Sequence, residues 1–364
     1  MRIVCVSLSK IPSDTANSIQ VMKVCQAFGQ LGHEVILLVP GPRPKDLLPA
    51  TLLRHYGLQT LFTIEWLPVR QRRMFPWTAA TRARRLGADL LYAWPIQSAV
   101  LGLLAGQPSM LELHDIPRGY FGPLWLRLFL TMPGRKRLLP ITDALRRALN
   151  LPAAQTVTAP DGVDLERYSF LPIPAAARSE LNLPDARTVL CTGHLYAGRG
   201  ADIFLTLAGK FPATSFVWVG GRPDDVATWR KCAVDLANVT FTGFVPNDRI
   251  PLYQSSADIL LMPYERTIAT SSGGNTANIC SPMKMFEYMA AGRAILTSDL
   301  PVLHEVLDED TAVFCPPEDG RAWEEALGEL LADENHRKEL GQHARSVVER
   351  YSWLERARRS LAEF

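Results

Sequence analysis

Residues 281–292 (SPMKMFEYMAAG) place one cation and one carboxylate three positions apart on an otherwise apolar stretch. Ser281 suits an N-cap, Pro282 the first helical position and Gly292 the C-terminal end, so the segment predicts a helix. Taking an ion out of water costs several kcal/mol, whereas an exposed pair at this spacing returns only about 0.2–0.5 kcal/mol. Lys284 and Glu287 therefore either form a buried structural pair or reach ligands.

A second segment with chemical potential is GHLYAGRG, residues 193–200, between an apolar run and a helical pattern. Its three glycines allow the backbone to approach a ligand, helix N-termini attract phosphate, and Arg199 adds a cation. The alternative is an ordinary turn with a solvated arginine. Together with the Gly/Ser loop at 271–278, whose amides suit an anion, Arg199 and Lys284 predict a diphosphate site. Glu287 is then available for ribose hydroxyl groups.

Short apolar runs alternate with helical patterns along the whole chain, which predicts parallel sheets covered on both faces. The runs lie at 2–8, 34–40, 61–68, 89–94, 110–113 and 138–142, and again at 188–193, 214–220, 238–243, 258–263, 294–298 and 312–315. We expect an α/β fold of two Rossmann-like, doubly wound domains, 1–172 and 173–349, with a hinge near 171–187. A C-terminal helix at about 350–364 is expected to pack back on the first domain. Ligands of such folds bind at the carboxyl ends of the strands, here in a cleft between domains.

Composition excludes several classes of protein. With 47% hydrophobic and 21% charged residues in 364, the chain has the composition of an ordinary soluble globular protein. Its apolar runs are too short to span a membrane, and no signal peptide is evident. Six scattered cysteines without a CxxC pair indicate reduced thiols, a cytoplasmic location and no zinc site. The dinucleotide-binding pattern GxGxxG and the P-loop pattern GxxxxGK[ST] are both absent after the first strand of each half.

Charge is divided unevenly along the chain. Residues 1–170 carry 20 Lys+Arg and 11 Asp+Glu (net +9), and residues 171–364 carry 19 and 26 (net −7), which sum to the overall +2. In the basic half, the apolar segment 123–133 precedes Arg135, Lys136 and Arg137, and further arginines lie at 70–73 and 82–85. This pattern predicts reversible contact with an anionic membrane surface; the alternative is a core helix with a solvated turn. Nucleic acid binding is not expected, because no known module is present.

The second half of the chain resembles the nucleotide-sugar half of family-4 glycosyltransferases. Four segments, in this order, carry the resemblance: GHLYAGRGADIF, FVWVGG, VTFTGFVPNDRIPLYQSSADILLMPY and SPMKMFEYMAAGRAILTSDLP. These are retaining enzymes of the two-domain GT-B fold. GHEVILLVP, ELHD (112–115), ITDALRRAL and APDGVDLERY resemble pieces of the N-terminal half. The resemblance implies a hexosyltransferase that moves a sugar from a nucleotide-diphosphate donor, needs no metal and no cofactor, and serves polysaccharide or glycolipid synthesis.

The resemblance also implies a role for individual residues. Arg199 and Lys284 would bind the donor diphosphate, Glu287 the ribose, and His114 of ELHD would lie beside the donor sugar, so that His114, Arg199 and Lys284 are the catalytic candidates. The remaining predicted donor contacts are Gly193, Gly243, Phe244, Val245, Ile279, Cys280 and Ser281.

Three departures from the family pattern stand out. Ile279 occupies the position of the first glutamate of the family's pair, and His194 replaces a frequent arginine. PSDTANSIQ (12–20) replaces a Gly-Gly loop, and Asn17 or Ser18 is expected at the acceptor or a phosphate. Two alternative functions stay open: a nucleotide-sugar epimerase of the same fold, and a nucleotide-sugar-binding subunit without activity.

Overall fold

A computed structural model of the chain describes residues 1–69, 71–268 and 275–364. Arg70 and the Ser271–Gly274 part of the expected Gly/Ser loop lie outside the described residues. The chain forms two compact units: a first unit of Met1–Asp161 with Trp353–Phe364, and a second unit of Gly162–Ser352. The expected domain boundary at residue 172 stays a prediction.

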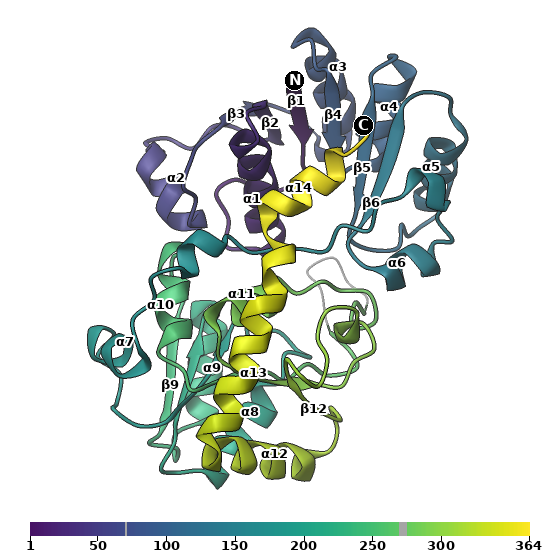
Figure 1. Ribbon diagram of the computed structural model, residues 1–364. Coiled ribbons are helices and arrows are strands. Elements are labelled where there is room, and N and C mark those ends of the chain that lie inside the picture. Colours follow the sequence, from purple (N-terminus) through teal and green to yellow (C-terminus); the bar gives the residue numbers. More distant parts are fainter. Residues whose placement is uncertain (70, 269–274) are drawn as a thin grey trace. The chain divides into compact units, whose positions relative to one another are not determined.

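The first unit is built on a six-stranded parallel sheet in the order β3-β2-β1-β4-β5-β6 (Figure 1). Its strands are β1 (Arg2–Val6), β2 (Glu34–Pro40), β3 (Thr63–Leu67), β4 (Leu90–Ala93), β5 (Ser109–Leu113) and β6 (Lys136–Pro140). The central strands are mostly apolar and almost entirely buried, as strands of a parallel sheet covered on both faces are, although β5 also buries Ser109 and Glu112.

Seven helices cover this sheet within the described residues. They are α1 (Ala16–Gln30), α2 (Pro49–Tyr56), α3 (Phe75–Arg85), α4 (Ile96–Leu104), α5 (Phe121–Thr131), α6 (Asp143–Ala148) and α14 (Trp353–Leu361). Helices α3, α4 and α5 pack side by side, and α14 packs against α1. The last helix of the chain thereby completes the unit that the first residues begin (Figure 1).

The second unit repeats the architecture with the strand order β12-β11-β10-β7-β8-β9. Its strands are β7 (Thr188–Thr192), β8 (Ser215–Val219), β9 (Val239–Gly243), β10 (Ile259–Met262), β11 (Ala294–Ser298) and β12 (Val313–Cys315). Its helices are α7 (Pro174–Glu180), α8 (Ala201–Lys210), α9 (Pro223–Cys232), α10 (Ile250–Ser255), α11 (Met283–Ala291), α12 (Gly320–Ala332) and α13 (Glu334–Val347). Phe204, Trp218 and Trp323 are fully buried in the core. The predicted α/β fold of two doubly wound sheets is confirmed.

The helix predicted at 281–292 begins later than expected. Pro282, not Ser281, occupies the N-cap position with extended backbone, and α11 begins at Met283. Gly292 ends the helix in the left-handed conformation, as predicted. Most of the body of α11 is buried, so the burial inferred from its composition is confirmed.

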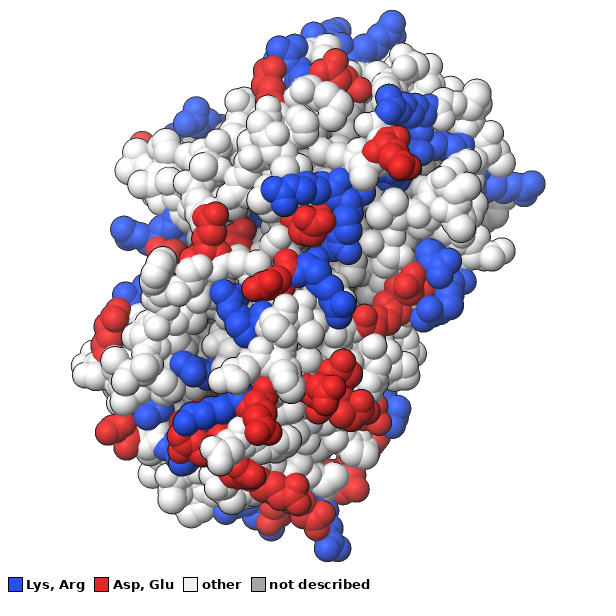
Figure 2. Space-filling view, in the orientation of Figure 1, with Lys and Arg blue, Asp and Glu red and all other residues white. Residues whose placement is uncertain are grey.

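The two units carry net charges of opposite sign. The first unit holds 22 Lys+Arg and 11 Asp+Glu (+11), the second 17 and 26 (−9), which again sum to +2. Figure 2 shows acidic side chains gathered where Figure 1 places α12. No helix in the described ranges combines the length and apolarity needed to cross a membrane.

Candidate functional site

In the second unit, the loop after β7 lies directly against the loop after β10. A Cβ at Gly198 would approach the Thr267 carbonyl oxygen to 2.0 Å, and one at Gly200 would approach the Pro263 carbonyl oxygen to 1.8 Å. Both glycines also have positive φ, 83° and 77°. Their backbone freedom serves this close packing of two loops, and the approach of their backbone to a ligand stays a prediction. The packing fixes the N-terminus of α8 at the carboxyl end of the sheet.

This packing brings Arg199 and Lys284 together around one aromatic ring, that of Tyr264. The Arg199 guanidinium donates to the Tyr264 hydroxyl at 3.0 Å and lies 5.1 Å from the ring centroid. The Lys284 Nζ lies 4.7 Å from the same centroid and donates to the Thr192 carbonyl oxygen at 3.0 Å. Cations at the face of an aromatic ring are held electrostatically. We call Arg199, Lys284 and Tyr264 the Tyr264 cluster.

Glu287 lies one helical turn beyond Lys284 on α11 and has a different neighbour. Its carboxylate accepts a hydrogen bond from the Gln254 amide at 3.3 Å, and the Tyr168 hydroxyl donates to the Gln254 oxygen at 2.8 Å. Burial, and then the charge of Glu287, raise the pKa of Tyr168, so this hydroxyl stays protonated and a donor. The chain of contacts orients Glu287, which is half-buried and able to accept further hydrogen bonds.

The other predicted donor contacts lie at neighbouring positions of the second unit. Gly193 follows β7 with a φ of 126°, and a Cβ there would lie 4.0 Å from the Lys284 Nζ. His194 stacks on Tyr196, their ring centroids 4.8 Å apart. Gly243 ends β9, and its carbonyl accepts from the Gly220 amide at 3.0 Å.

Phe244 is half-exposed next to Gly243, and Val245 follows it. Ile279, Cys280 and Ser281 form the segment that leads into α11. The Ile279 side chain is buried, and the amides of residues 279 and 280 both donate to the Thr276 carbonyl oxygen.

In the first unit, a cavity of about 290 Å³ opens at the carboxyl ends of β1, β4 and β5. It is lined by Ser7, Leu8, Asn17, Trp94, Pro95, Ile96, Glu112, Leu113, His114, Asp115, Ile116 and Pro117. His114, directly after β5, contributes a side chain that is 29% exposed. The Asn17 amide donates to the Ser9 hydroxyl at 2.8 Å. Ser18 is fully buried, and its hydroxyl donates to the carbonyl oxygens of Ser13 and Thr15.

Behind His114 lies a buried carboxylate, Glu112, that gathers hydrogen bonds from four side chains. His114 Nε2 donates to its Oε1 at 2.8 Å, Arg356 donates to the same oxygen at 2.7 Å, and Gln20 and Tyr92 also donate. Burial alone would raise the pKa of Glu112, but Arg356 and His114 outweigh it and hold the pKa at about 2. Glu112 is therefore ionised at neutral pH. These five residues are called the Glu112 network.

Sequence reasoning missed Tyr264, Gln254 and Arg356. Glu112 and Arg356 are 244 positions apart, and Gln254 and Glu287 are 33 apart, so no local spacing connects them. The residue type of Arg356 also gave no signal, because it lies in a helix with two further arginines. A buried carboxylate in the apolar strand MLEL was the available hint that a cation had to lie opposite.

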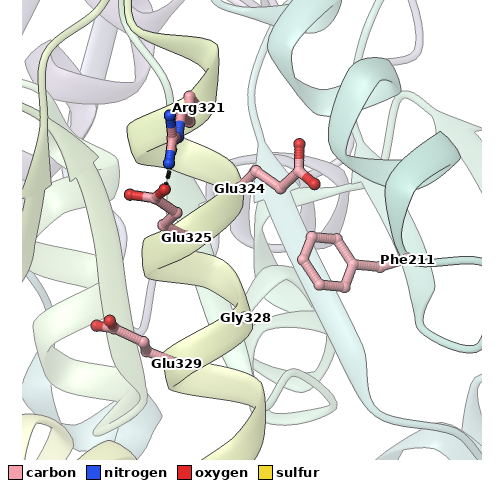
Figure 3. A pocket seen from close by; sticks show the side chains of 6 residues that line it. All are labelled: Phe211, Arg321, Glu324, Glu325, Gly328 and Glu329. Atoms are coloured by element: carbon pink, nitrogen blue, oxygen red, sulfur yellow. Dashed lines mark hydrogen bonds and ion pairs between the residues drawn. The ribbon is translucent and has the colours of Figure 1, made fainter.

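A second surface depression, of about 600 Å³, lies in the second unit beside α12. Figure 3 shows its lining of Phe211, Arg321, Glu324, Glu325, Gly328 and Glu329. Arg321 pairs with Glu325 at 2.7 Å and Lys210 pairs with Glu324 at 3.2 Å, and the lining itself holds three carboxylates against one cation. This charge disfavours an anionic nucleotide, so the depression is not the candidate site.

Across 1–69, 71–268 and 275–364 no three His, Cys, Asp or Glu side chains gather as metal ligands, and metal independence stays a prediction.

Comparison with known proteins places these observations in a family context. Residues 186–333 match the family model described as Glycosyl transferases group 1. The chain is 26% identical over 358 residues to a phosphatidyl-myo-inositol mannosyltransferase of Mycolicibacterium smegmatis, covering 92% of this chain and 85% of that protein.

Two solved structures share the fold. Sucrose-phosphate synthase from Thermosynechococcus elongatus superposes with a TM-score of 0.75 at 19% identity, covering 98% of this chain and 96% of that chain. Anabaena Alr3699/HepE, in complex with UDP and glucose, gives a TM-score of 0.74 at 16% identity over the full length of both chains.

Proposed function

We propose that this chain, a family-4-like glycosyltransferase of the GT-B fold that uses a nucleotide-sugar donor, transfers a hexose with retention to a glycan or lipid-linked acceptor. The product would serve cell-surface polysaccharide or glycolipid assembly. The named mannosyltransferase relative acts, by its name, on a phosphatidylinositol, which supports a lipid-linked acceptor. The Tyr264 cluster is the observation that carries the donor part of the proposal.

Transfer breaks the bond between the anomeric carbon and the donor phosphate, so negative charge develops on the departing diphosphate. Preorganised cations stabilise such charge without reorganising during the reaction. Arg199 and Lys284 are held on the ring and hydroxyl of Tyr264 and on a backbone carbonyl, and this preorganisation is what the step requires. Glu287 would accept hydrogen bonds from the ribose hydroxyls.

Retention is proposed to follow a front-face route. The acceptor oxygen bonds to the anomeric carbon on the side that the phosphate leaves, and the acceptor proton passes to the departing phosphate oxygen. No carboxylate nucleophile is needed, which fits the buried Ile279 in place of a glutamate. His114 would contact a sugar hydroxyl in the cavity of the first unit.

The donor proposal is tested by a thermal-shift panel of UDP- and GDP-sugars, because a ligand that binds the folded protein raises its melting temperature. Arg199→Ala and Glu287→Ala should fold and lose the donor-induced shift, whereas Glu325→Ala at the acidic depression should keep it. A full shift in either site variant would refute its assigned role. Free nucleotide diphosphate after incubation supports transfer, an altered sugar supports an epimerase, and binding without turnover supports an inactive subunit.

Contact with an anionic membrane surface is proposed for an exposed apolar surface of the first unit. On α5 and the residue before it, Tyr120, Phe121 and Leu124 are 88%, 64% and 56% exposed. The Trp77 ring of α3 meets the Trp125 ring of α5 edge-on at 6.5 Å, which joins the two helices into one surface. Several bulky apolar side chains exposed on one surface favour contact with a nonpolar partner.

The basic residues first considered for this contact are engaged within the chain. Lys136 donates to the Leu130 carbonyl oxygen at 2.7 Å, Arg137 donates to the carbonyl oxygens of Ser360 and Ala362, and Arg135 lies over the Phe364 ring. The apolar surface therefore supports the membrane proposal more directly than this cluster does. Vesicles containing anionic lipid should bind the parent protein, and Phe121→Ser/Leu124→Ser should weaken binding more than Arg135→Ser. Equal binding by parent and double variant, or none by the parent, would refute the proposal.

A further inference from the structure

Glu112 is a carboxylate with no exposed side-chain surface at the base of the His114 cavity. Its Oε1 atom takes hydrogen bonds from both His114 and Arg356, while Tyr92 donates to Oε2. The Trp94 indole of the cavity wall joins the same network through the Gln20 oxygen at 3.1 Å. The buried network thus reaches the cavity through two of its lining side chains.

Arg356 enters this network from α14, and its side chain is only 2% exposed. Besides Glu112 it donates to the carbonyl oxygens of Pro160 at 2.9 Å and Ala159 at 3.1 Å. The guanidinium fork is thereby fixed in direction as well as in charge. The final helix of the chain supplies the counter-ion that keeps Glu112 ionised.

A carboxylate can only accept hydrogen bonds, which determines the tautomer of the neutral His114 ring. Nε2, which faces Glu112, must carry the proton, and Nδ1 is then the ring acceptor. A histidine without such a partner exchanges between the two tautomers. The Glu112 network selects the form whose remaining nitrogen can accept a hydrogen bond from a hydroxyl group.

We propose that Glu112 and Arg356 are positioning residues for His114: together they hold the ring in the Nε2–H tautomer, so that Nδ1 accepts a hydrogen bond from a hydroxyl of the sugar or acceptor. The proposal rests on the proposed function of His114. Stability alone does not explain the pair, because replacing a buried ion pair with apolar side chains is often neutral or stabilising.

The tautomer of the wild-type protein is the first test, and it needs no destabilising change. Long-range ¹H–¹⁵N spectra of the ¹⁵N-histidine-labelled protein at pH 8, with the His114 signal assigned by its loss in His114→Gln, distinguish the two ring nitrogens. We expect a proton on Nε2 and an unprotonated Nδ1. A ring with Nδ1 protonated, or one that averages between tautomers, would overturn the proposal.

The second test removes both members of the buried ion pair, so that neither Glu112 nor Arg356 is left without the other. Glu112→Leu/Arg356→Met should fold, should keep the donor-induced thermal shift and donor KM, and should lose roughly 10- to 100-fold in kcat, as expected for a misplaced catalytic group. Its matched control is Asp258→Leu/Arg178→Met, which removes another largely buried ion pair, at 3.2 Å, in the second unit. The control should leave kcat unchanged.

A conservative variant separates positioning from packing. Glu112→Gln/Arg356→Met restores an uncharged acceptor for Nε2 and should recover most of the lost kcat. If the Leu/Met variant has wild-type kcat while His114→Ala is inactive, the positioning proposal fails and the proposed function stands. If His114→Ala itself keeps wild-type kcat, the role of His114 in the proposed function fails.

Discussion

At the scale of the residue, charge on α11 is explained by separate partners rather than by mutual pairing. Lys284 reaches the Thr192 carbonyl oxygen and the Tyr264 ring, whereas Glu287 reaches Gln254. The Glu287 carboxylate is half-buried, and a carboxylate can accept hydrogen bonds in addition to the one that the Gln254 amide donates. Glu287 is thus held in place and still able to bind a ligand hydroxyl.

A substitution of Glu287 tests whether its carboxylate binds a hydroxyl group of the donor. Glu287→Gln removes the charge but keeps the shape, and a hydrogen bond to a charged group is worth about 1.5–3 kcal/mol. We expect the dissociation constant of the nucleotide sugar to rise roughly 10- to 100-fold by calorimetry, with the melting temperature of the free protein little changed. Glu325→Gln on α12 is the control and should bind the donor normally; equal affinity of both variants would contradict the assignment.

At the scale of the element, the position of α8 depends on two loops in close contact. Gly200 is its N-cap, with φ of 77°, and has no room for a side chain because the Pro263 carbonyl oxygen lies opposite. The loop after β10, which also carries Tyr264, therefore locates the Arg199 side chain.

Two glycine substitutions separate backbone strain from this packing. Gly200→Ala combines about 1–2 kcal/mol of left-handed strain with about 1–3 kcal/mol of overpacking, so we expect a loss of roughly 3 kcal/mol in the free energy of unfolding. Gly243→Ala, at a φ of 75° with no atom within 4 Å of the added carbon, should lose only about 1–2 kcal/mol. Urea unfolding measures both, and equal losses would show that loop packing adds nothing.

At the scale of the whole molecule, the chain returns at its end to the unit where it began. Helix α14 packs on α1 and places Arg356 opposite Glu112, so the first unit depends on residues from both ends of the chain. Because Arg356 keeps Glu112 ionised in the folded protein, this contact makes stability depend on pH.

The pH dependence has a definite sign. The folded pKa of Glu112, about 2, lies below its ordinary value of 4.5, so the stability it contributes is present above pH 4.5 and is lost as pH falls towards 2. The full shift corresponds to about 3 kcal/mol, of which about 2 kcal/mol is lost between pH 6 and pH 3. We expect urea unfolding to show that, between pH 6 and pH 3, the wild type loses about 2 kcal/mol more of its free energy of unfolding than Glu112→Leu/Arg356→Met does. Parallel pH profiles of the two proteins would contradict it.

Local pattern was sufficient to predict the two parallel sheets, the burial of α11 and the residues of its cation and carboxylate. Parallel strands are buried on both faces and read as apolar runs, and helix ends are marked by residues such as Gly292, so these features are written locally. The first turn of α11 was misplaced because Ser281 and Pro282 both fit a helix start.

Only the tertiary structure decided which distant residues meet. Arg199 and Lys284 both contact the ring of Tyr264, and Arg356 contacts Glu112, so these contacts join positions separated by up to 244 residues. Such pairs form because a buried charge needs a partner of opposite charge. The sequence shows that a buried carboxylate needs a cation, but it does not show which of the many cations of the chain that is. The sequence by itself determined the fold and the types of group at the site, and chain packing determined their partners, because hydrophobic periodicity is local and charge compensation is not.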